Sequence, residues 1–494
     1  MLDKCQAGFM IYIKQAFPIY RDFCPGTQKA KIVENQFQKI FDKQKAYFFS
    51  DVTKTYEWRL EQLTRLGKML EENADAFKEA LRSDFKTASF EPQQEIMVCL
   101  GSIAETKEKL REWMKPEPIT LPKRLSDTGH SAFIFREPYG VTLIIGPFNA
   151  PLVLLMEPLI NALSAGNNAI VKPSESVSHV SAAYEKFIPQ YFAEEAVAVV
   201  TGGKETVTQL LELPFDFIFF TGSTKVGKIV MRAAAEHLTP VLLELGGQNP
   251  VLVDKTANLR EAARKIIWGA TAFAGQWCVR PGYVYVEASV ADEFVTACKA
   301  ALHDMYGDDP AKSPDYSRII SEKDVNRLAG LLEDGKVVYG GQYDVNKRYF
   351  SPTLVYPATW KDKIMQDEIF GPLLPIIPYK DVHEVIPVIK SKPRPLGGYV
   401  YSQDQQLIDT FITSISFGGG CVNQNNIQTF FTGLVPFGGV GTSGLGKYYG
   451  KYGFESLTNA KTIIVSPSNQ TVDDFLPPFT DEKKKDYLSW FLPA

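Results

Sequence analysis

The chain has 494 residues, of which 45% are hydrophobic and 22% carry a formal charge. Single hydrophobic cores stop growing at about 250–300 residues, so two or three folded domains are expected. The net charge of −4 gives no electrostatic case for nucleic acid or an anionic membrane as the main partner. The five histidines are scattered and form no HExxH-like pair, so a zinc hydrolase is excluded and no metal is expected.

Neither end of the chain has the features of an integral membrane segment. The apolar run in the first 31 residues is broken by Lys14 and Gln15, is too short to span a bilayer and lacks the pattern of a secretion signal. The final DYLSWFLPA is also too short, which leaves only weak peripheral contact open. No CxxC pair occurs, as is typical of reduced thiols in a cytoplasm-like compartment. The cysteines are Cys5, Cys24, Cys99, Cys278, Cys298 and Cys421.

Along the chain, helical and strand-like patterns follow one another in a regular order. Residues 32–115 repeat apolar residues at spacings of three and four, which predicts surface helices, and the proline-rich 116–122 predicts an extended connector. From residue 136, short β-rich runs such as GVTLIIG, DFIFFTG and PVLLELGG alternate with helical stretches, and NPVLVD begins a second such series. Apolar strands separated by helices indicate parallel sheets covered on both faces. The predicted fold class is therefore α/β, with two such domains.

Three residues have the chemistry of an active site, although each also has an ordinary structural interpretation. Cys278 lies in FAGQWCVRPGY, but most free cysteines are small buried side chains. Glu244 lies between apolar residues in LELGGQNP, where burial would give it the raised pKa of a general base or leave it a structural carboxylate. Asn149 in IIGPFNAP follows a predicted strand, and its amide suits either a developing oxyanion or a turn.

Two further motifs suit a nucleotide. FFTGSTKVGKIVM predicts a strand, a turn with Gly222, Ser223 and Gly227, and then a helix, whose first N–H groups favour a pyrophosphate. An ordinary strand–turn–helix junction explains this motif equally well. In VKPSES, Lys172 and Glu175 can bind a ribose diol, whereas the alternative is a helix cap beside a solvated lysine.

The order of these motifs is more specific than any one of them. KPSE, FTGST, LELGG, GQWC and EIFGP follow one another, with Cys278 34 positions after Glu244, and this closely resembles the aldehyde dehydrogenase superfamily over roughly residues 32–465. Within it the chain is most similar to class 3, the aromatic and fatty aldehyde branch. The supporting stretches are AAAEHLTPVLLELGG, RPLGGYVYS and VPFGGVGTSGLGKYYGKYGFESLTNAK.

The resemblance implies the roles of the three catalytic candidates. Cys278 would be the nucleophile, the Asn149 amide and the Cys278 backbone N–H would hold the oxyanion, and Glu244 would activate the water that hydrolyses the thioester. The product would then be a carboxylic acid. A relative that makes acyl-CoA or reduces an activated acid, for which this base is not needed, is the alternative within enzymes; a non-catalytic protein that binds NAD or an aldehyde is the alternative outside them.

The resemblance also implies a nicotinamide cofactor. Lys172 and Glu175 would clamp the adenosine ribose, and Glu175 would repel a 2′-phosphate, so NAD is expected while NADP remains possible. Glu368 would contact the nicotinamide ribose and Phe370 would pack beside the ring. Gly222, Ser223 and Gly227 would lie near a loosely held pyrophosphate.

By the same resemblance the chain divides into a Rossmann-like cofactor domain, an α/β catalytic domain and a small β bridging element. Class 3 relatives are typically dimers through that element, so a homodimer in the cytoplasm is expected. The boundaries are an N-terminal arm at 1–31, the cofactor domain at 32–243 interrupted by a bridging segment at 116–135, the catalytic domain at 244–430, and a C-terminal bridging segment and tail at 431–494.

Four positions near the expected substrate tunnel depart from the family pattern. Ala150 opens space after Asn149, while Trp277 before Cys278 fills space or offers a stacking wall. These changes predict a tunnel reshaped for a bulky, mostly apolar or aromatic aldehyde. Gln248 replaces a common lysine, and Arg280 either meets an anionic substrate group or forms a surface or interdomain salt bridge.

Overall fold

The structure is a computed structural model that describes residues 35–333, 335–469, 472 and 475–490. The N-terminal arm predicted at 1–31 therefore lies outside the described residues, as do Cys5 and Cys24. The chain divides into two compact units, residues 1–38 and 39–494. The first is described only from residue 35 onward, and the sheets and their hydrophobic cores lie in the second.

The first large sheet has six strands in the order β17-β7-β6-β3-β4-β5. All neighbours are parallel except β17, which pairs antiparallel with β7. Every residue of β3 and β4 is buried, as expected for strands covered on both faces. The strands are β3 (Val141–Ile145), β4 (Asn168–Lys172), β5 (Val197–Val199), β6 (Phe217–Gly222), β7 (Val241–Leu245) and β17 (Gly444–Leu445).

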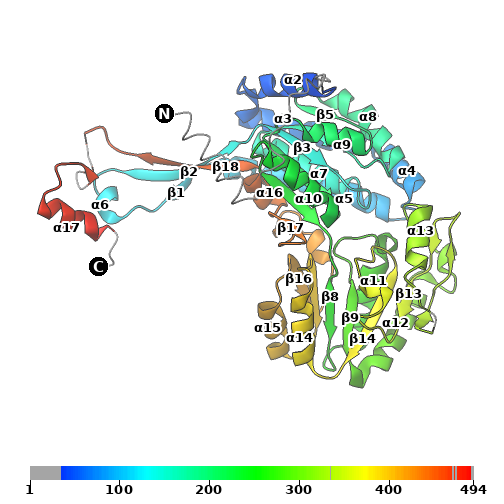
Figure 1. Cartoon of the computed structure of the whole chain (residues 1–494). Helices are drawn as coiled ribbons and strands as arrows, with labels where there is room; N and C mark the ends of the chain where they lie inside the picture. The colour runs from blue at the N-terminus through cyan, green and yellow to red at the C-terminus, as the bar shows by residue number, and fades with distance from the viewer. Residues whose placement is uncertain (1–34, 334, 470–471, 473–474, 491–494) are drawn as a thin grey trace, which may run out of the picture. The chain divides into compact units, whose positions relative to one another are not determined.

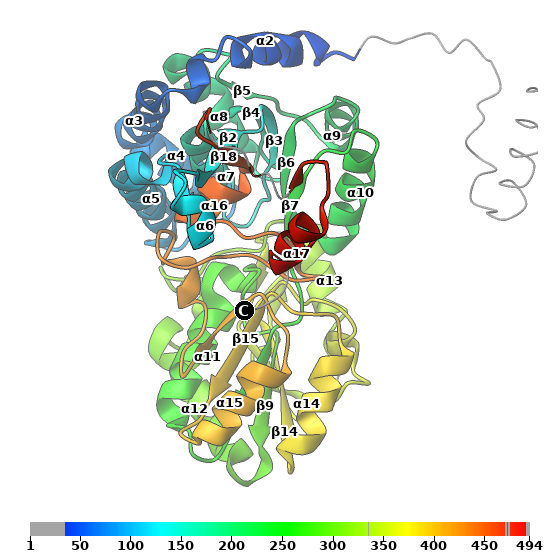
Figure 2. The same ribbon diagram turned by 90° about the vertical axis from the view of Figure 1, so that its left-hand side faces the viewer.

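Helices cover both faces of this sheet (Figure 2). Helix α7 is mostly apolar, and all its residues after the first are buried, so it forms the centre of the first core. In Figure 2, α9 and α10 lie on the opposite side of the strands from α3, α5 and α7. The helices are α2 (Gln38–Phe48), α3 (Tyr56–Glu72), α4 (Ala74–Asp84), α5 (Glu91–Trp113), α7 (Val153–Ala165), α8 (Ser178–Tyr191), α9 (Lys204–Leu211), α10 (Thr224–Ala235) and α16 (Gly450–Ser456).

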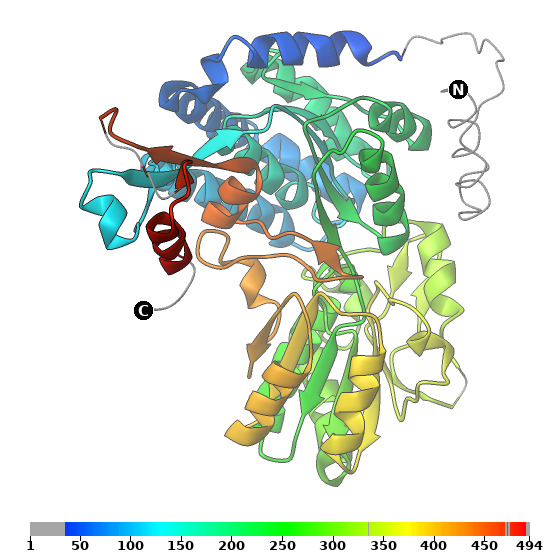
Figure 3. The ribbon, with the colours of Figure 1, turned by 60° about the vertical axis from the view of Figure 1, so that its left-hand side comes forward.

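The second large sheet has seven strands in the order β10-β13-β14-β9-β8-β15-β16 and its own hydrophobic core. Only β10 runs antiparallel to its neighbour. The chain enters this sheet directly from β7 through Gly246–Asn249 (Figure 3). Its strands are β8 (Pro250–Val253), β9 (Tyr283–Glu287), β10 (Val337–Tyr339), β13 (Thr353–Val355), β14 (Leu373–Tyr379), β15 (Gly397–Tyr401) and β16 (Gly419–Val422). The accompanying elements are α11 (Leu259–Thr271), α12 (Ala291–Tyr306), α13 (Glu322–Ala329), α14 (Val382–Ser391), α15 (Gln405–Ser414) and the hairpin β11 (Tyr343–Asp344) with β12 (Tyr349–Phe350).

A third, small sheet joins segments that lie far apart in the sequence (Figure 1). Strand β2 (Ser131–Pro138) pairs antiparallel with β1 (Glu117–Ile119) and, over its whole length, with β18 (Thr458–Val465). Two short helices accompany it, α6 (Lys123–Ser126) and α17 (Asp481–Ser489). The predicted α/β class with parallel, Rossmann-like sheets is confirmed, while the exact domain boundaries and the bridging role of the small sheet stay predictions.

The described residues hold neither a membrane-spanning helix nor a cluster of metal ligands. None of the helices in residues 35–490, the masked positions left out, is both long and apolar enough to cross a membrane. In the same part of the chain, His, Cys, Asp and Glu side chains nowhere gather in the threes that a metal ion needs.

Candidate active site

Cys278 follows a turn with an unusual backbone. Phe273, Ala274 and Gly275 have φ angles of 55°, 52° and 71°, in the left-handed region that residues other than glycine seldom adopt. This turn ends α11 and delivers the thiol to the first core, where Cys278 is 8% exposed. The side-chain amide of Asn249, just before β8, donates a hydrogen bond of 2.8 Å to the Cys278 carbonyl. Both the turn and the neighbouring strand therefore fix the position of the thiol.

Glu244, near the end of β7, lies beside that thiol. It has no exposed surface, and neither carboxylate oxygen meets a hydrogen-bond partner of good geometry among the described residues. Burial raises the pKa of Glu244 to about 8, while the Cys278 thiol and the Thr221 hydroxyl lower it by less. A carboxyl group with a pKa near neutrality is able to take a proton and release it again, which is what a general base requires.

The thiol itself is not activated by a positive charge. Burial raises the pKa of Cys278 well above its ordinary value, and the adjacent Glu244 carboxylate raises it further. Before it attacks an electrophile, the thiol must therefore lose its proton to a neighbouring base. Glu244 is the neighbouring group that is able to accept this proton.

Asn149 is a buried donor without an acceptor. It lies between β3 and α7, is 3% exposed, and its Nδ2 has no hydrogen-bond partner among the described residues. A buried amide left in this state costs about 1–3 kcal/mol. A donor held ready for a charge that appears only during a reaction has this property.

Lys172 and Glu175 form an ion pair at the carboxyl end of β4. Lys172 Nζ lies 2.6 Å from Glu175 Oε2, with side-chain exposures of 2% and 57%. Partial burial alone would raise the pKa of Glu175, but the bond from Lys172 holds it below its ordinary value. An ionised carboxylate therefore faces solvent at the edge of the sheet where open α/β sheets bind nucleotides.

The glycine-rich motif forms the predicted strand–turn–helix junction between β6 and α10. Ser223 caps α10 by accepting a bond of 3.4 Å from the backbone N–H of Val226. A Cβ on Gly227 would lie 2.7 Å from Cδ2 of Leu245, so this glycine lets α10 approach β7. Packing alone explains why residue 227 is a glycine. Gly222 and Ser223 lie where β6 ends and α10 begins, so they are close to the first N–H groups of the helix, which suit an anion.

Glu368 approaches the segment that follows Glu244. Its Oε1 accepts a bond of 3.1 Å from the backbone N–H of Gly247, and a Cβ on Gly246 would lie 2.2 Å from its Oε2. Burial raises the pKa of Glu368 to about 7. Gly246 is thus needed for the close approach of the two segments. Phe370 packs edge to face on Phe148, with ring centroids 5.8 Å apart.

An almost wholly apolar cavity opens beside Cys278. Trp277 forms part of its wall and packs against three aromatic rings, with centroid distances of 5.7 Å to Trp268, 4.9 Å to Phe273 and 5.9 Å to Phe430. Ala150 also lines it, so two of the four unusual positions border the space next to the thiol. The cavity is lined by Gln94, Glu95, Val98, Ala150, Val153, Leu154, Phe273, Trp277, Cys278, Thr429, Phe430, Phe437 and Tyr449.

The other two unusual positions act through the backbone. Gln248 donates to the carbonyls of Met365 and Asp367, at 2.9 and 3.0 Å, and so holds the segment that leads to Glu368. Arg280 is 2% exposed and donates to the Leu373 carbonyl over 2.7 Å. The expected surface or interdomain salt bridge of Arg280 is therefore wrong, because burial leaves it a carbonyl as its partner. It does not line the cavity beside Cys278.

Several residues of the site were not predicted. Thr221 lies directly opposite Glu244 in the pairing of β6 with β7, and its hydroxyl lies next to the carboxyl group whose pKa it lowers. Tyr449 is buried and lines the cavity. Both lie inside motifs used for the resemblance, so their positions carried a signal that composition did not. Lys86, buried near the cavity, has no such motif.

Comparison with known proteins agrees with this geometry. The model of the aldehyde dehydrogenase family matches residues 27–463. The chain is 41% identical over 450 residues to 4,4'-diaponeurosporen-aldehyde dehydrogenase of Staphylococcus aureus, covering 90% of this chain and 97% of that protein. It is 41% identical over 419 residues to aldehyde dehydrogenase family 3 member B1 of Homo sapiens, covering 85% and 89%.

Solved structures place the chain in the same group. The substrate-bound AldH of Staphylococcus aureus superposes with a TM-score of 0.89 at 40% identity, covering 92% of this chain and 99% of that one. A Mycobacterium tuberculosis aldehyde dehydrogenase with NAD+ gives 0.74 at 29% identity, covering 84% and 86%. A Methanocaldococcus jannaschii glyceraldehyde-3-phosphate dehydrogenase with NADP gives 0.76 at 26%, covering 87% and 94%. The resemblance to the class 3 branch is confirmed, and the chain belongs to the aldehyde dehydrogenase family, whose members oxidise aldehydes with a nicotinamide nucleotide.

Proposed function

We propose that this enzyme oxidises a bulky, apolar aldehyde to its carboxylic acid, with Cys278 as nucleophile, Glu244 as general base and Asn149 as oxyanion donor. One observation carries the proposal: the Cys278 thiol, at the wall of an apolar cavity, lies beside a buried carboxyl group that has no fixed partner among the described residues. The buried Asn149 amide, also without a partner there, supplies the third component.

The reaction divides into two halves on the same sulfur atom. Cys278 loses its proton to Glu244, and Sγ bonds to the aldehyde carbon while the oxygen becomes an oxyanion held by Asn149 Nδ2 and the Cys278 backbone N–H. A nicotinamide nucleotide held by Lys172, Glu175 and Glu368 would supply the hydride acceptor. Once this carbon has lost its hydride, a thioester remains on Cys278. Glu244, having released its first proton to solvent, then removes a proton from water. The water oxygen attacks the thioester carbon, the C–S bond breaks, and the acid leaves as the thiol is restored.

The residues fit NAD as the nucleotide. Lys172 and Glu175 would hold the adenosine ribose, and the exposed Glu175 carboxylate suits a diol rather than a 2′-phosphate. Gly222, Ser223 and Gly227 would lie near the pyrophosphate at the start of α10, and Gly227 supports that site only by its packing. Glu368 would bond the nicotinamide ribose, and Phe370 would pack beside the ring.

Replacing Glu175 with Gln should change the nucleotide preference. The variant removes a negative charge that would face a 2′-phosphate, so kcat/KM for NADP relative to NAD should rise about tenfold. Glu205→Gln on α9, another exposed carboxylate, is the matched control and should leave the ratio unchanged. An unchanged ratio in Glu175→Gln would remove Glu175 from the nucleotide site.

The cavity wall supports a bulky apolar substrate. Trp277, Phe273 and Phe430 offer aromatic faces, while Ala150 leaves room beside the catalytic amide. The Staphylococcus aureus relative named for 4,4'-diaponeurosporen-aldehyde agrees with a long apolar substrate.

We also expect a homodimer through the small sheet, where Ile464 and Val465 are exposed, and a location in the cytoplasm.

NADH formation with short, long-chain, benzylic and polyene aldehydes tests this function. We expect bulky apolar aldehydes to give the highest kcat/KM. Trp277→Thr should change the ranking of bulky against short aldehydes by about tenfold, because the wall of the cavity changes. No turnover with any aldehyde would contradict the function, and an unchanged ranking in the variant would contradict the role of the cavity wall.

A further inference from the structure

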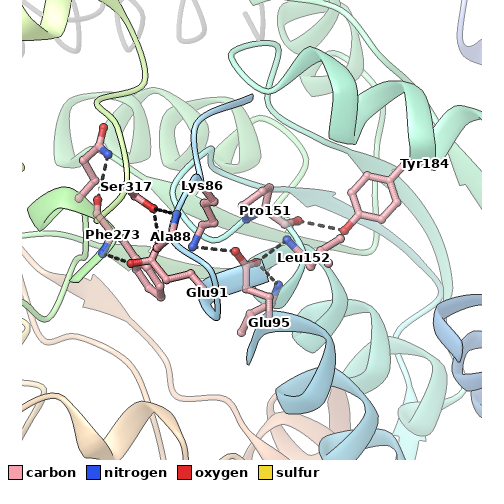
Figure 4. Close-up of polar contacts among 11 residues, drawn as sticks. Lys86, Ala88, Glu91, Glu95, Pro151, Leu152, Tyr184, Phe273 and Ser317 are labelled. Carbon is pink, nitrogen blue, oxygen red and sulfur yellow. Dashed lines mark hydrogen bonds and ion pairs between the residues drawn. The ribbon is translucent and has the colours of Figure 1, made fainter. Parts of the chain in front are cut away.

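One buried cation near the site has no role in the proposed reaction. Lys86, between α4 and α5, has no exposed surface, and its Nζ lies 2.8 Å from Oε1 of the buried Glu95 (Figure 4). The same Nζ lies 3.3 Å from the centroid of the Phe273 ring. Lysine is almost never fully buried unless it is paired, so this position is costly to maintain.

The partner of Lys86 holds the segment that carries Asn149. Glu95 Oε2 accepts bonds from the backbone N–H groups of Leu152 and Val153, at 2.9 and 3.3 Å, at the start of α7 (Figure 4). A carboxylate at this position also interacts favourably with the helix dipole. Asn149 is only a few residues before this helix start, so the placement of its amide depends on Glu95.

A second carboxylate holds the turn that carries Cys278. Glu91, at the start of α5, accepts bonds from the Phe273 backbone N–H at 2.8 Å and from Ser317 Oγ at 2.6 Å (Figure 4). Phe273 is the first of the three consecutive residues with positive φ. Residues other than glycine, here Phe273 and Ala274, keep such angles only where their surroundings hold them. Glu91 holds the backbone of this turn, and the Lys86 ammonium lies over the Phe273 ring.

We propose that Lys86 is a positioning residue for aldehyde oxidation. Its ammonium contacts both Glu95, which fixes the start of α7, and Phe273, which begins the turn before the thiol. It thereby links the two segments whose amide and thiol must meet the same carbonyl group. This inference rests on the proposed roles of Cys278 and Asn149, because those roles make the relative placement of the two segments matter for the rate.

The experiment removes the charge pair without leaving an unpaired charge. Lys86→Met alone would leave the buried Glu95 carboxylate without its cation, which is expected to impair folding. In the double variant Lys86→Met, Glu95→Gln, the glutamine oxygen still accepts bonds from Leu152 and Val153. This variant should fold, yet its kcat should fall about 10- to 100-fold, because small displacements of reacting groups are costly. KM for NAD should stay within about twofold.

Two readouts separate positioning from a merely structural role. The first is kcat with the shortest aldehyde that turns over, which contacts least of the cavity wall. The second is the rate of iodoacetamide alkylation of Cys278, which reports the thiol's surroundings directly and should also change. Lys336→Met, Asp362→Asn removes an ion pair at the edge of the second sheet and is the matched control, with unchanged kcat expected. A folded double variant with wild-type kcat and alkylation rate would overturn the proposal.

Failure of this inference is distinguishable from failure of the proposed function. If Cys278→Ser retains turnover, the proposed function fails whatever Lys86 does. If turnover depends on Cys278 while the double variant keeps the wild-type kcat, only the role of Lys86 fails. If turnover depends on Cys278 and the double variant loses kcat at constant KM for NAD, both stand.

Discussion

Cys278→Ser is expected to lower kcat for aldehyde oxidation at least about 10⁴-fold, the size of loss seen when a catalytic nucleophile is removed. A serine hydroxyl is a much weaker acid than a thiol, and Glu244, with a pKa raised to about 8, is too weak a base to ionise it. Without the thioester neither half of the reaction proceeds. Steady-state NADH formation and the first turnover, measured by stopped flow, should both be lost.

The matched control uses a cysteine from the second core. Cys298 has no exposed surface and lies on α12, so Cys298→Ala should leave kcat unchanged. Iodoacetamide followed by mass spectrometry should label Cys278 before the other described cysteines, because among them only Cys278 lines the cavity. Turnover that persists in Cys278→Ser would show that the thiol is not the nucleophile.

The fold class could be predicted because the strands of the first large sheet are buried on both faces. A strand such as Val141–Ile145 is apolar except for one threonine, and such a sequence is typical of a parallel sheet covered on both faces. Glu244 and Cys278 could be paired because the spacing of two known motifs carries that information. Taken singly, Glu244 had an equally good structural interpretation, and for Cys278 an ordinary buried side chain was the better one.

The remaining parts of the site depend on long-range packing that no local pattern encodes. Lys86 follows a helix whose periodicity predicts a surface, yet Glu95 and Phe273 enclose its ammonium. Arg280 was expected to meet an anionic substrate group or to form a surface or interdomain salt bridge, whereas it donates a hydrogen bond to the backbone carbonyl of Leu373. The motif around Gly227 suggests a glycine near a bound phosphate, but the structure explains this glycine by packing, because a Cβ there would overlap with the side chain of Leu245. For Lys86 and Arg280, the partners Phe273 and Leu373 lie far away in the sequence.

Glu244→Gln should slow both halves of the reaction. The amide cannot accept a proton from the Cys278 thiol or from water, so the steady-state rate should fall about 10²- to 10⁴-fold, the usual contribution of a general base. Mixing enzyme, NAD and aldehyde should therefore release NADH without a rapid first equivalent per active site, as in Cys278→Ser. A full burst of about one equivalent of NADH in Glu244→Gln would show that the thiol loses its proton to another group and that Glu244 acts only in hydrolysis.

The pH dependence of the same variant follows from the raised pKa. Hydrolysis needs the charged carboxylate, so the wild-type rate should rise as pH increases through about 8, the raised pKa of Glu244, and the rate of Glu244→Gln should lack this rise.

The stability of the wild-type protein should change with pH in the opposite direction to its rate. Because the native state keeps a proton that the unfolded chain loses at a lower pH, wild-type stability falls as pH rises from about 4.5 to about 8. Thermal unfolding measured at several pH values should therefore show that the stability of Glu244→Gln relative to the wild type increases from about pH 4.5 to about pH 8. If the stabilities of the two proteins change with pH in the same way, the carboxyl group of Glu244 is not buried in a protonated state.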